Sequence, residues 1–412
     1  MKTVTRVLQL GMILSFFMSA ATAANIRIAY IDPLSGPFAA VGQNALNSWK
    51  YAAELANNGK WAGNDTIEVV GFDNKGSPQE SLIQLKTAID QGFRYITQGN
   101  GSGVALALID TINKHNERNP GKEVLFLNYA ANDPDLTNSK CSFWHFRFDA
   151  NSDMKMEAIT THMAAQPNIK KVYIIGQNFA FGHQVSRAAK EYLKRKRPDI
   201  TIVGDDLHPI GQVKDFSPYI AKIKASGADT VITGNWGTDL SLLVRAANDA
   251  DLKADFYTYY ANTAGVPTAL GASGAGRIKN VWYWNINSEG FPGKDIAEGF
   301  KKRYKDDYIG MSTFTAMAFL ARAMVEAKSS DPLKVAFAME GMKVQSLNGV
   351  VEMRKSDHQA QQPLYISTWT KTNGKDVRYD QENTGFGWKT SAKSDAFVGS
   401  QPTSCAMKRP TH

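Results

Sequence analysis

Three polar, glycine-bearing segments each follow an apolar run that is typical of a buried strand. They are DPLSGPFAAVG at 32–42, QGNGSG at 98–103 and NYAANDPDLT at 128–137. Parallel strands end at the same edge of a sheet, and ligands bind outside that edge. We therefore expect the three segments to form one ligand site. The second segment also opens a helix, whose N-terminus presents N–H groups and partial positive charge to a carboxylate or phosphate.

Taken alone, GNGSG is weak support for such a site. It has neither the GxGxxG nor the GxxxxGKS spacing of phosphate-binding loops, so by itself a plain turn is the better interpretation. Aromatic residues add to the pattern further along the chain, at Phe179, Phe181, Trp236, Tyr259 and Tyr260. Rings at strand ends suit a planar ligand, although each ring could equally pack in a core. We expect Phe179 and Tyr259 in the core and Trp236 against a ligand.

The sequence gives little support for catalysis or for a metal site. No GxSxG turn presents a nucleophile, and neither CxxC nor HExxH occurs. The carboxylate pairs at 205–206 and 306–307 are adjacent in sequence, so their side chains diverge, and we expect them on the surface. Two carboxyls brought together by the fold, as in glycosidases, stay open as an alternative. We predict a protein that is not an enzyme and holds no cofactor and no metal.

The elements that position these residues follow a repeated order. Apolar runs of four to eight residues alternate with helix-length stretches over 26–129, and the same order restarts over 172–285. This alternation indicates βαβ units and parallel sheets. Mature length also exceeds what one hydrophobic core usually accommodates. We predict an α/β protein of two Rossmann-like lobes.

Two lobes built this way need several crossings of the chain. We place them near Arg147, Asn285 and Gly349, which gives a three-strand hinge. The expected lobes are listed here: residues 24–147 plus 286–349 form lobe 1, and residues 148–285 plus 350–412 form lobe 2. The tail after residue 370 is expected to be irregular.

The N-terminus has the features of a secretory signal peptide. Lys2 and Arg6 precede an apolar run, which ends in the small residues 21–23. The run is shorter than the ~20 residues that span a bilayer. We expect cleavage after Ala23, no lipid anchor because no cysteine follows, and a soluble exported protein.

Charge and cysteine usage bear on the partners and the compartment of the protein. The formal net charge is +8, and the basic runs at 190–199 and 301–307 are interleaved with acids, as on solvated helix faces. No nucleic-acid recognition motif is present, so we predict no nucleic-acid partner. The only cysteines, Cys141 and Cys405, are expected to form one disulfide in an oxidising compartment, which would pin the C-terminal tail to the body.

Taken together, these segments resemble a known family. PLSGPFAAVG, FDNKGSPQES, NYAANDPDLT, FRFDAN, NFAFGHQ and KDFSPYIAKIKASGADTVITGNWGTDL are similar to stretches of the periplasmic substrate-binding proteins of branched-chain amino acid ABC transporters, the leucine-binding family. The resemblance runs from Ile26 to about Thr370. It implies the type I periplasmic binding fold, closure of two lobes on a small molecule in the periplasm, and docking on an inner-membrane ABC permease with its ATPase. We expect a monomer.

The resemblance also implies the residues that contact the ligand. They are Val41, Ser102, Gly103, Ala130 and Asn132 in the first lobe and Phe181, Trp236 and Tyr260 in the second. By the same resemblance, the Ser102 hydroxyl and the N–H groups of Gly103 and Asn132 would hold a carboxylate.

One position departs from the family pattern. Amino-acid binders carry an acidic residue where this chain has Tyr260, and that acid pairs with the ligand's ammonium. A buried ammonium without a charged partner is costly. We therefore expect a hydrophobic carboxylate, with aromatic acids as the leading class. A true branched-chain amino acid binder and the ligand-sensing subunit of a receptor system are the alternatives.

Overall fold

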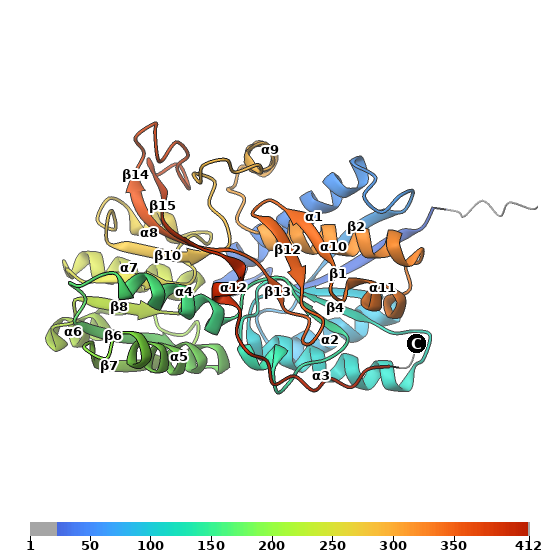
Figure 1. Ribbon diagram of the computed structural model, residues 1–412, viewed down its shortest axis with the longest axis horizontal. Helices are drawn as coiled ribbons and strands as arrows, with labels where there is room; N and C mark the ends of the chain where they lie inside the picture. Colours follow the sequence, from blue (N-terminus) through green and yellow to red (C-terminus); the bar gives the residue numbers. More distant parts are fainter. Residues whose placement is uncertain (1–22, 411–412) are drawn as a thin grey trace, which may run out of the picture.

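The computed structural model describes residues 23–410. The expected signal peptide lies outside the described residues, apart from Ala23. Two α/β lobes lie side by side along the long axis of the molecule (Figure 1). Within residues 23–410, no helix has the length and apolar character needed to cross a membrane.

The first lobe is built around a five-stranded parallel sheet of order β2-β1-β3-β4-β5. Its strands read as continuous apolar runs because helices cover both faces of the sheet. The strands are β1 (Asn25–Asp32), β2 (Thr66–Asp73), β3 (Tyr95–Gln98), β4 (Leu125–Asn128) and β5 (His145–Arg147). The alternating helices are α1 (Ala39–Asn58), α2 (Pro78–Asp90) and α3 (Ser102–Arg118), with short 3₁₀ turns η1 (Gly36–Phe38) and η2 (Pro134–Thr137).

The second lobe contains a seven-stranded sheet of order β15-β14-β10-β9-β8-β6-β7. Five of its strands are parallel: β6 (Lys171–Gln177), β7 (Thr201–His208), β8 (Thr230–Thr233), β9 (Asp255–Thr258) and β10 (Ile278–Trp282). Its helices are α4 (Ser152–Ala164), α5 (Ala180–Lys196), α6 (Ser217–Ser226), α7 (Gly237–Asp249) and α8 (Val266–Leu270). The predicted α/β fold with two lobes is confirmed.

Two antiparallel strands complete this sheet at its β10 edge. β14 (Leu364–Lys371) pairs with β10, and β15 (Phe386–Ser394) pairs with β14. The expectation of an irregular tail after residue 370 is therefore wrong for β15. Its sequence FGWKTSAKS carries few apolar residues because an edge strand needs them on only one face.

The third crossing between the lobes comes later than expected. β11 (Lys343–Ser346), β12 (Gly349–Met353) and β13 (Ala360–Gln361) form a small antiparallel sheet. Val351, Met353 and Ala360 are buried in the first-lobe core with α10 (Met311–Ala327) and α11 (Pro332–Met339). The predicted lobe boundary at Gly349 is corrected to follow β13. The hydrophobic alternation there belongs to a hairpin within lobe 1.

The three crossing segments are joined by side-chain amides. Asn348 Nδ2 donates to the carbonyl of Tyr283 at 2.9 Å and to Gln362 Oε1 at 3.2 Å. Gln362 Nε2 in turn donates to the carbonyl of Phe148 at 2.8 Å. All four residues are buried. These bonds connect the crossings to one another, so the lobes can bend about the hinge without separating.

A fourth link comes from the C-terminal tail. After α12 (Ala396–Gly399), which packs on α4, the chain runs across to the first lobe (Figure 1). A disulfide joins Cys141 to Cys405, as the sequence predicted. Beyond it, Lys408 Nζ lies 2.9 Å from Glu117 Oε1 on α3. The tail thus ties the end of lobe 2 to the body of lobe 1.

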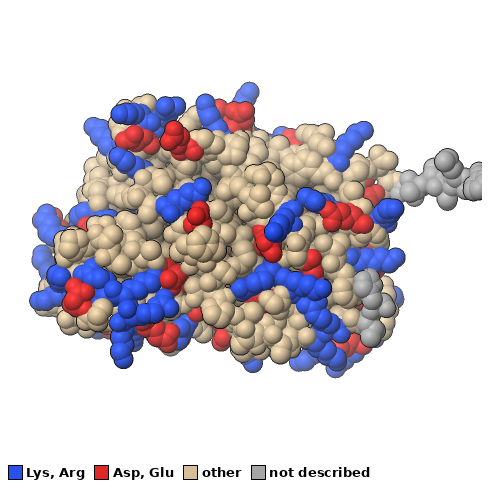
Figure 2. All heavy atoms as spheres, viewed as in Figure 1, with Lys and Arg blue, Asp and Glu red and all other residues tan. Residues whose placement is uncertain are grey.

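The basic runs lie on the surface among acidic residues. Figure 2 shows Lys and Arg side chains interspersed with Asp and Glu over one face of the molecule. In the first run, Arg195 on α5 pairs with Glu157 on α4. In the second run, Lys301 Nζ lies 2.9 Å from Asp307 Oδ1. This arrangement is that of a solvated helix face.

Candidate ligand-binding site

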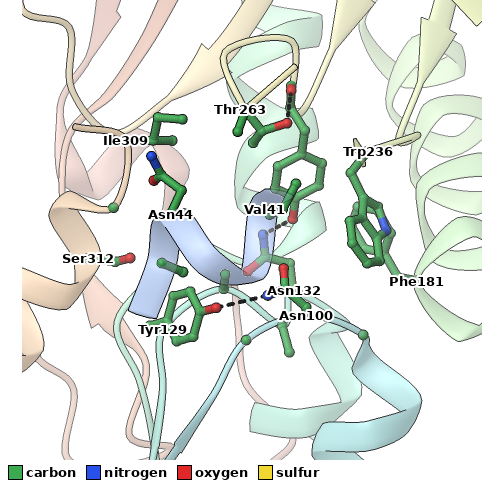
Figure 3. Close-up of a pocket in the computed structure, with 18 of the residues that line it drawn as sticks. Val41, Asn44, Asn100, Tyr129, Asn132, Phe181, Trp236, Thr263, Ile309 and Ser312 are labelled. Carbon is green, nitrogen blue, oxygen red and sulfur yellow. Dashed lines mark hydrogen bonds between the residues drawn. The ribbon is translucent and has the colours of Figure 1, made fainter. Parts of the chain in front are cut away.

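A cavity lies between the lobes, where loops from both sheets meet (Figure 3). It contains about 670 Å³ of space, counting its open mouth. In lobe 1 the strand order reverses between β1 and β3, and the segments after these strands contribute Val41, in the first turn of α1, and residues 99–102. In lobe 2 it reverses between β6 and β8, whose loops contribute Phe181 and Trp236. The cavity therefore occupies the switch points of both sheets, where open α/β sheets bind ligands.

Most predicted site residues meet in this cavity. Its lining includes seven of the eight, namely Val41, Ser102, Ala130, Asn132, Phe181, Trp236 and Tyr260. Gly103 is outside the lining: it is exposed in the first turn of α3, and a side chain there would meet no atom within 4 Å. Phe179, which we expected in the core, lines the cavity. Tyr259 is fully buried, and its hydroxyl donates to the carbonyl of Ser152 at 2.9 Å.

The lining contains no charged side chain. Its polar groups are neutral hydroxyls and amides, such as Asn44, Asn100, Ser102 and Thr263, and aromatic rings cover much of the rest. Tyr260 stands where the family pattern has an acid, and its hydroxyl accepts a hydrogen bond from Asn132 Nδ2. The site is therefore apolar and aromatic, with neutral hydrogen-bonding groups.

A buried carboxyl group shapes the first-lobe wall. Asp32, at the end of β1, accepts the N–H groups of Gly99 and Asn100, each at 3.0 Å, and the hydroxyl of Tyr129 at 2.7 Å. Asn100 Nδ2 donates to the same hydroxyl at 3.0 Å. Neutral donors hold Asp32, so burial dominates and raises its pKa to about 7. Asp32 is a positioning residue that our sequence reasoning missed, although it directly follows an apolar run.

A buried ion pair supports the second-lobe wall. Lys155 Nζ lies 2.8 Å from Asp149 Oδ2, and neither side chain is exposed. The ammonium lies 4.9 Å from the ring centre of Tyr260 and 4.6 Å from that of Trp282, both of which line the cavity. Burial lowers the pKa of Lys155 and raises the pKa of Asp149, while their mutual attraction opposes both shifts. Sequence reasoning missed this pair, because a lysine within a helix gives no sign of burial.

The same ion pair orients Asn132. Asp149 Oδ2 accepts a hydrogen bond from Asn132 Nδ2 at 2.9 Å. Asn132 Oδ1 is buried and has no hydrogen-bond partner among the described residues. Figure 3 shows Asn132 between Tyr129 and the rings of Phe181 and Trp236. Its amide is therefore held by Asp149 and Tyr260, and its oxygen is closed off from the cavity.

Aromatic residues from the two lobes meet at the mouth of the cavity. The rings of Phe38, on η1, and Trp236, before α7, lie 4.1 Å apart between centres. Beside them, Thr238 Oγ1 donates to the carbonyl of Pro37 at 2.5 Å. These contacts join lobe 1 to lobe 2, so the structure has the lobes closed over the cavity. Phe38 was not among the predicted residues, although it lies within the segment 32–42.

Known proteins are similar to this chain in sequence and in fold. A family model described as periplasmic binding protein matches residues 25–375. The Leu/Ile/Val-binding protein homolog 4 of Brucella abortus (strain 2308) is 32% identical over 399 residues, covering 95% of each chain. The closed crystal structure of a leucine-, isoleucine-, valine-, threonine- and alanine-binding protein from Brucella ovis matches with a TM-score of 0.82 and 30% identity, over 94% of this chain and 100% of that one.

A more distant likeness extends to a protein solved with an aromatic ligand. The solute-binding protein of an ABC transporter from Rhodopseudomonas palustris HaA2, in complex with p-hydroxybenzoic acid, has a TM-score of 0.75 at 21% identity, covering 90% of this chain and 97% of that one. At that identity the likeness shows the fold alone.

The family's members bind solutes, which confirms the prediction of a protein that is not an enzyme. The chain belongs to the periplasmic binding protein family, as a solute-binding protein of the branched-chain amino acid ABC transporter type.

Proposed function

We propose that this protein captures a small aromatic carboxylate between its lobes and delivers it to an inner-membrane ABC permease with its ATPase. The observation that carries this proposal is the lining of the main cavity, which is rich in aromatic rings and contains no charged side chain.

The uncharged lining disfavours a zwitterionic amino acid. Its ammonium would be buried beside Tyr260 with no carboxylate to pair with. Asp32 and Asp149, the buried carboxyls next to the lining, already accept hydrogen bonds from other groups. Burying an unpaired charge carries a large free-energy cost.

A ligand carboxylate, in contrast, has suitable neutral partners. Ser102 opens α3, so its hydroxyl and the N–H groups of the first helical turn lie at the positive end of a helix dipole. Ser102 Oγ already accepts the Asp133 N–H at 3.2 Å, which leaves its proton available to a ligand.

The second lobe supplies the contacts for a ring. Phe181, Trp236 and Tyr260 line that side of the cavity and offer faces and edges for aromatic packing. Lys155 lies over the rings of Tyr260 and Trp282 and holds them in place from behind, with its charge balanced by Asp149. The p-hydroxybenzoic acid complex of the Rhodopseudomonas palustris protein is an example of this fold with an aromatic acid bound.

Calorimetric titration of the purified protein tests the ligand class. We expect saturable micromolar binding of benzoate, weaker binding of cyclohexanecarboxylate because it lacks the planar ring, and no response to leucine. Micromolar leucine binding without a response to aromatic acids would overturn the proposal.

A branched-chain amino acid is the second candidate. Relatives at 30% and 32% identity carry names that refer to such amino acids. The same titration separates the two candidates.

The proposed mechanism is capture by lobe closure. A ligand first contacts the polar wall of lobe 1, and closure adds the rings of lobe 2, which shifts an open–closed equilibrium toward the closed form.

We further propose export through a signal peptide that is cleaved after Ala23, and a monomer in the periplasm. Mass spectrometry of the protein recovered from the periplasm would give a mature chain beginning at Ala24. A sensory role stays the alternative to transport, and genes for a permease and an ATPase beside this gene would favour transport.

A further inference from the structure

A second cavity adjoins the first, and Trp282 and Ile309 line both. It contains about 770 Å³ of space, counting its open mouth. Its walls come from both lobes: α9 (Lys294–Tyr304) packs against lobe 1, while β10, β14 and β15 belong to lobe 2. None of the site residues predicted from the sequence lines it. The proposed function leaves this space without a role.

The loop between β14 and β15 builds one wall of the second cavity, and hydrogen bonds fix it in place. Asn287 donates through Nδ2 to the carbonyl of Tyr379 and accepts the Tyr379 N–H through Oδ1, both at 2.9 Å. Gln381 Nε2 donates to the carbonyl of Asn262 at 2.6 Å, and Trp388 Nε1 donates to Gln381 Oε1 at 2.7 Å. Tyr379, Gln381 and Trp388 all lie beyond residue 375, where the family match ends. This wall is thus an ordered structure outside the matched region.

Two buried polar atoms in this lining have no partner among the described residues. They are Nε1 of Trp282 and Oδ1 of Asn262, in side chains only 5% and 8% exposed. Leaving one such group unpaired costs about 1–3 kcal/mol. Each atom has less than 1 Å² of accessible surface, so an occupant of the cavity does not reach it, and the chemistry of the occupant is set by the other groups of the lining.

The charged groups of the second cavity are mostly acidic. Asp307, Asp380 and Glu298 line it together with Lys301, whose Nζ lies 2.9 Å from Asp307 and 3.9 Å from Asp380. Lys294 Nζ lies 3.9 Å from Glu298 Oε1, so three carboxylates face two ammonium groups. The balance is still a negative local charge, which attracts a cation and repels an anion. The first cavity, lined by neutral groups, lacks this property.

Aromatic residues complete the lining. Trp284, Tyr308, Tyr379 and Trp388 all face this space, and the faces of such rings attract an ammonium. We propose that the second cavity is a binding site for a small aromatic amine, whose ammonium faces the acidic side chains and whose ring packs on the tryptophans. Because both lobes contribute to its walls, an occupant there would stabilise the closed form. The proposal does not depend on which ligand fills the first cavity.

Calorimetric titration with benzylamine tests the second site. Benzylamine has the ring of benzoate with the opposite charge, and benzyl alcohol has the same ring without charge. We expect benzylamine to bind saturably, at one equivalent, to the protein alone and to the protein saturated with benzoate. Benzyl alcohol should bind at least about tenfold more weakly, because it lacks the charge-assisted hydrogen bond. Competition between benzylamine and benzoate, equal binding of benzyl alcohol, or no saturable benzylamine binding would each overturn the proposal.

Two variants locate the site. Asp380→Asn and Glu298→Gln each remove one carboxylate from the lining, so each should weaken benzylamine binding about tenfold while benzoate binding is unchanged. Trp236→Ala, which alters only the first cavity, is the matched control and should leave benzylamine affinity unchanged. If benzoate fails to bind but benzylamine binds and responds to Asp380→Asn, the second site stands and only the proposed function fails. Benzylamine affinity that responds to Trp236→Ala but not to Asp380→Asn would place the amine in the first cavity.

Discussion

The two lobes line the main cavity in different ways. Lobe 1 contributes loop backbone and small polar side chains, held in place by neutral donors around the buried carboxyl of Asp32. Lobe 2 contributes rings, supported from behind by the Asp149–Lys155 ion pair. The difference indicates that the two lobes bind different parts of a ligand: lobe 1 holds its polar end, and lobe 2 packs on its ring.

Removing the charge behind the lobe 2 wall should have the largest effect. Lys155→Met leaves Asp149 buried without its partner, which should lower the free energy of unfolding by about 3–5 kcal/mol. Urea unfolding measures this change. The matched control is the double variant Lys155→Met with Asp149→Asn, which should recover much of the loss. Equal instability of the single and double variants would mean that the ion pair is not what supports the wall.

Cutting the tail that joins the two lobes should have the next largest effect. Cys405→Ser opens the disulfide to Cys141 and should lower the free energy of unfolding by about 2–4 kcal/mol. Urea unfolding of wild type under reducing conditions should give the same loss, while the reductant should not affect the variant. A variant as stable as the oxidised wild type would show that the tail contributes nothing to holding the lobes.

Removing a ring from the lobe 2 wall should reduce affinity more than stability. Trp236→Ala deletes a ligand contact and the stacking partner of Phe38, and should weaken benzoate binding about tenfold to a hundredfold. Phe38→Ala removes the stacking partner from the other lobe and should cost less. Calorimetry gives both affinities. If Trp236→Ala lowers thermal stability equally in the ligand-free and the ligand-bound protein and leaves the affinity unchanged, Trp236 is a core residue.

The lobe 1 wall should respond to pH through Asp32. Burial raises the pKa of Asp32 to about 7 from its ordinary value of 3.8, so the folded protein favours the neutral carboxyl. Its contribution to the free energy of unfolding is therefore fully present below about pH 4 and is lost as the pH rises through about 7. The stability of wild type relative to Asp32→Asn should fall across that window, by at least about 1 kcal/mol. Urea unfolding across this pH range measures the difference, and a flat or rising difference would contradict the assignment.

Local patterns in the sequence predicted the fold and most of the cavity. Strands such as β1 and β4 are buried on both faces, so they read as unbroken apolar runs, and the loops after them carry the ligand-facing residues. Because the cavity forms where such loops meet, order along the chain was enough to bring Val41, Ser102 and Trp236 together.

The features that the sequence did not predict depend on distant partners. Lys155 looks like an ordinary helix residue until the fold places it over Tyr260 and Trp282, more than 100 positions away. Apolar and polar residues alternate along β12, and this pattern would be the same in either lobe. Only the pairing of β12 with β11 shows that it belongs to lobe 1. β15 carries too few apolar residues to be recognised without β14 beside it.

Small-angle X-ray scattering with two ligands tests most directly whether the lobes close on an aromatic acid. The radius of gyration of the ligand-free protein should fall when benzoate is added and stay unchanged with leucine, because only benzoate suits the uncharged lining of the cavity. A radius of gyration that falls with leucine and not with benzoate would contradict that claim.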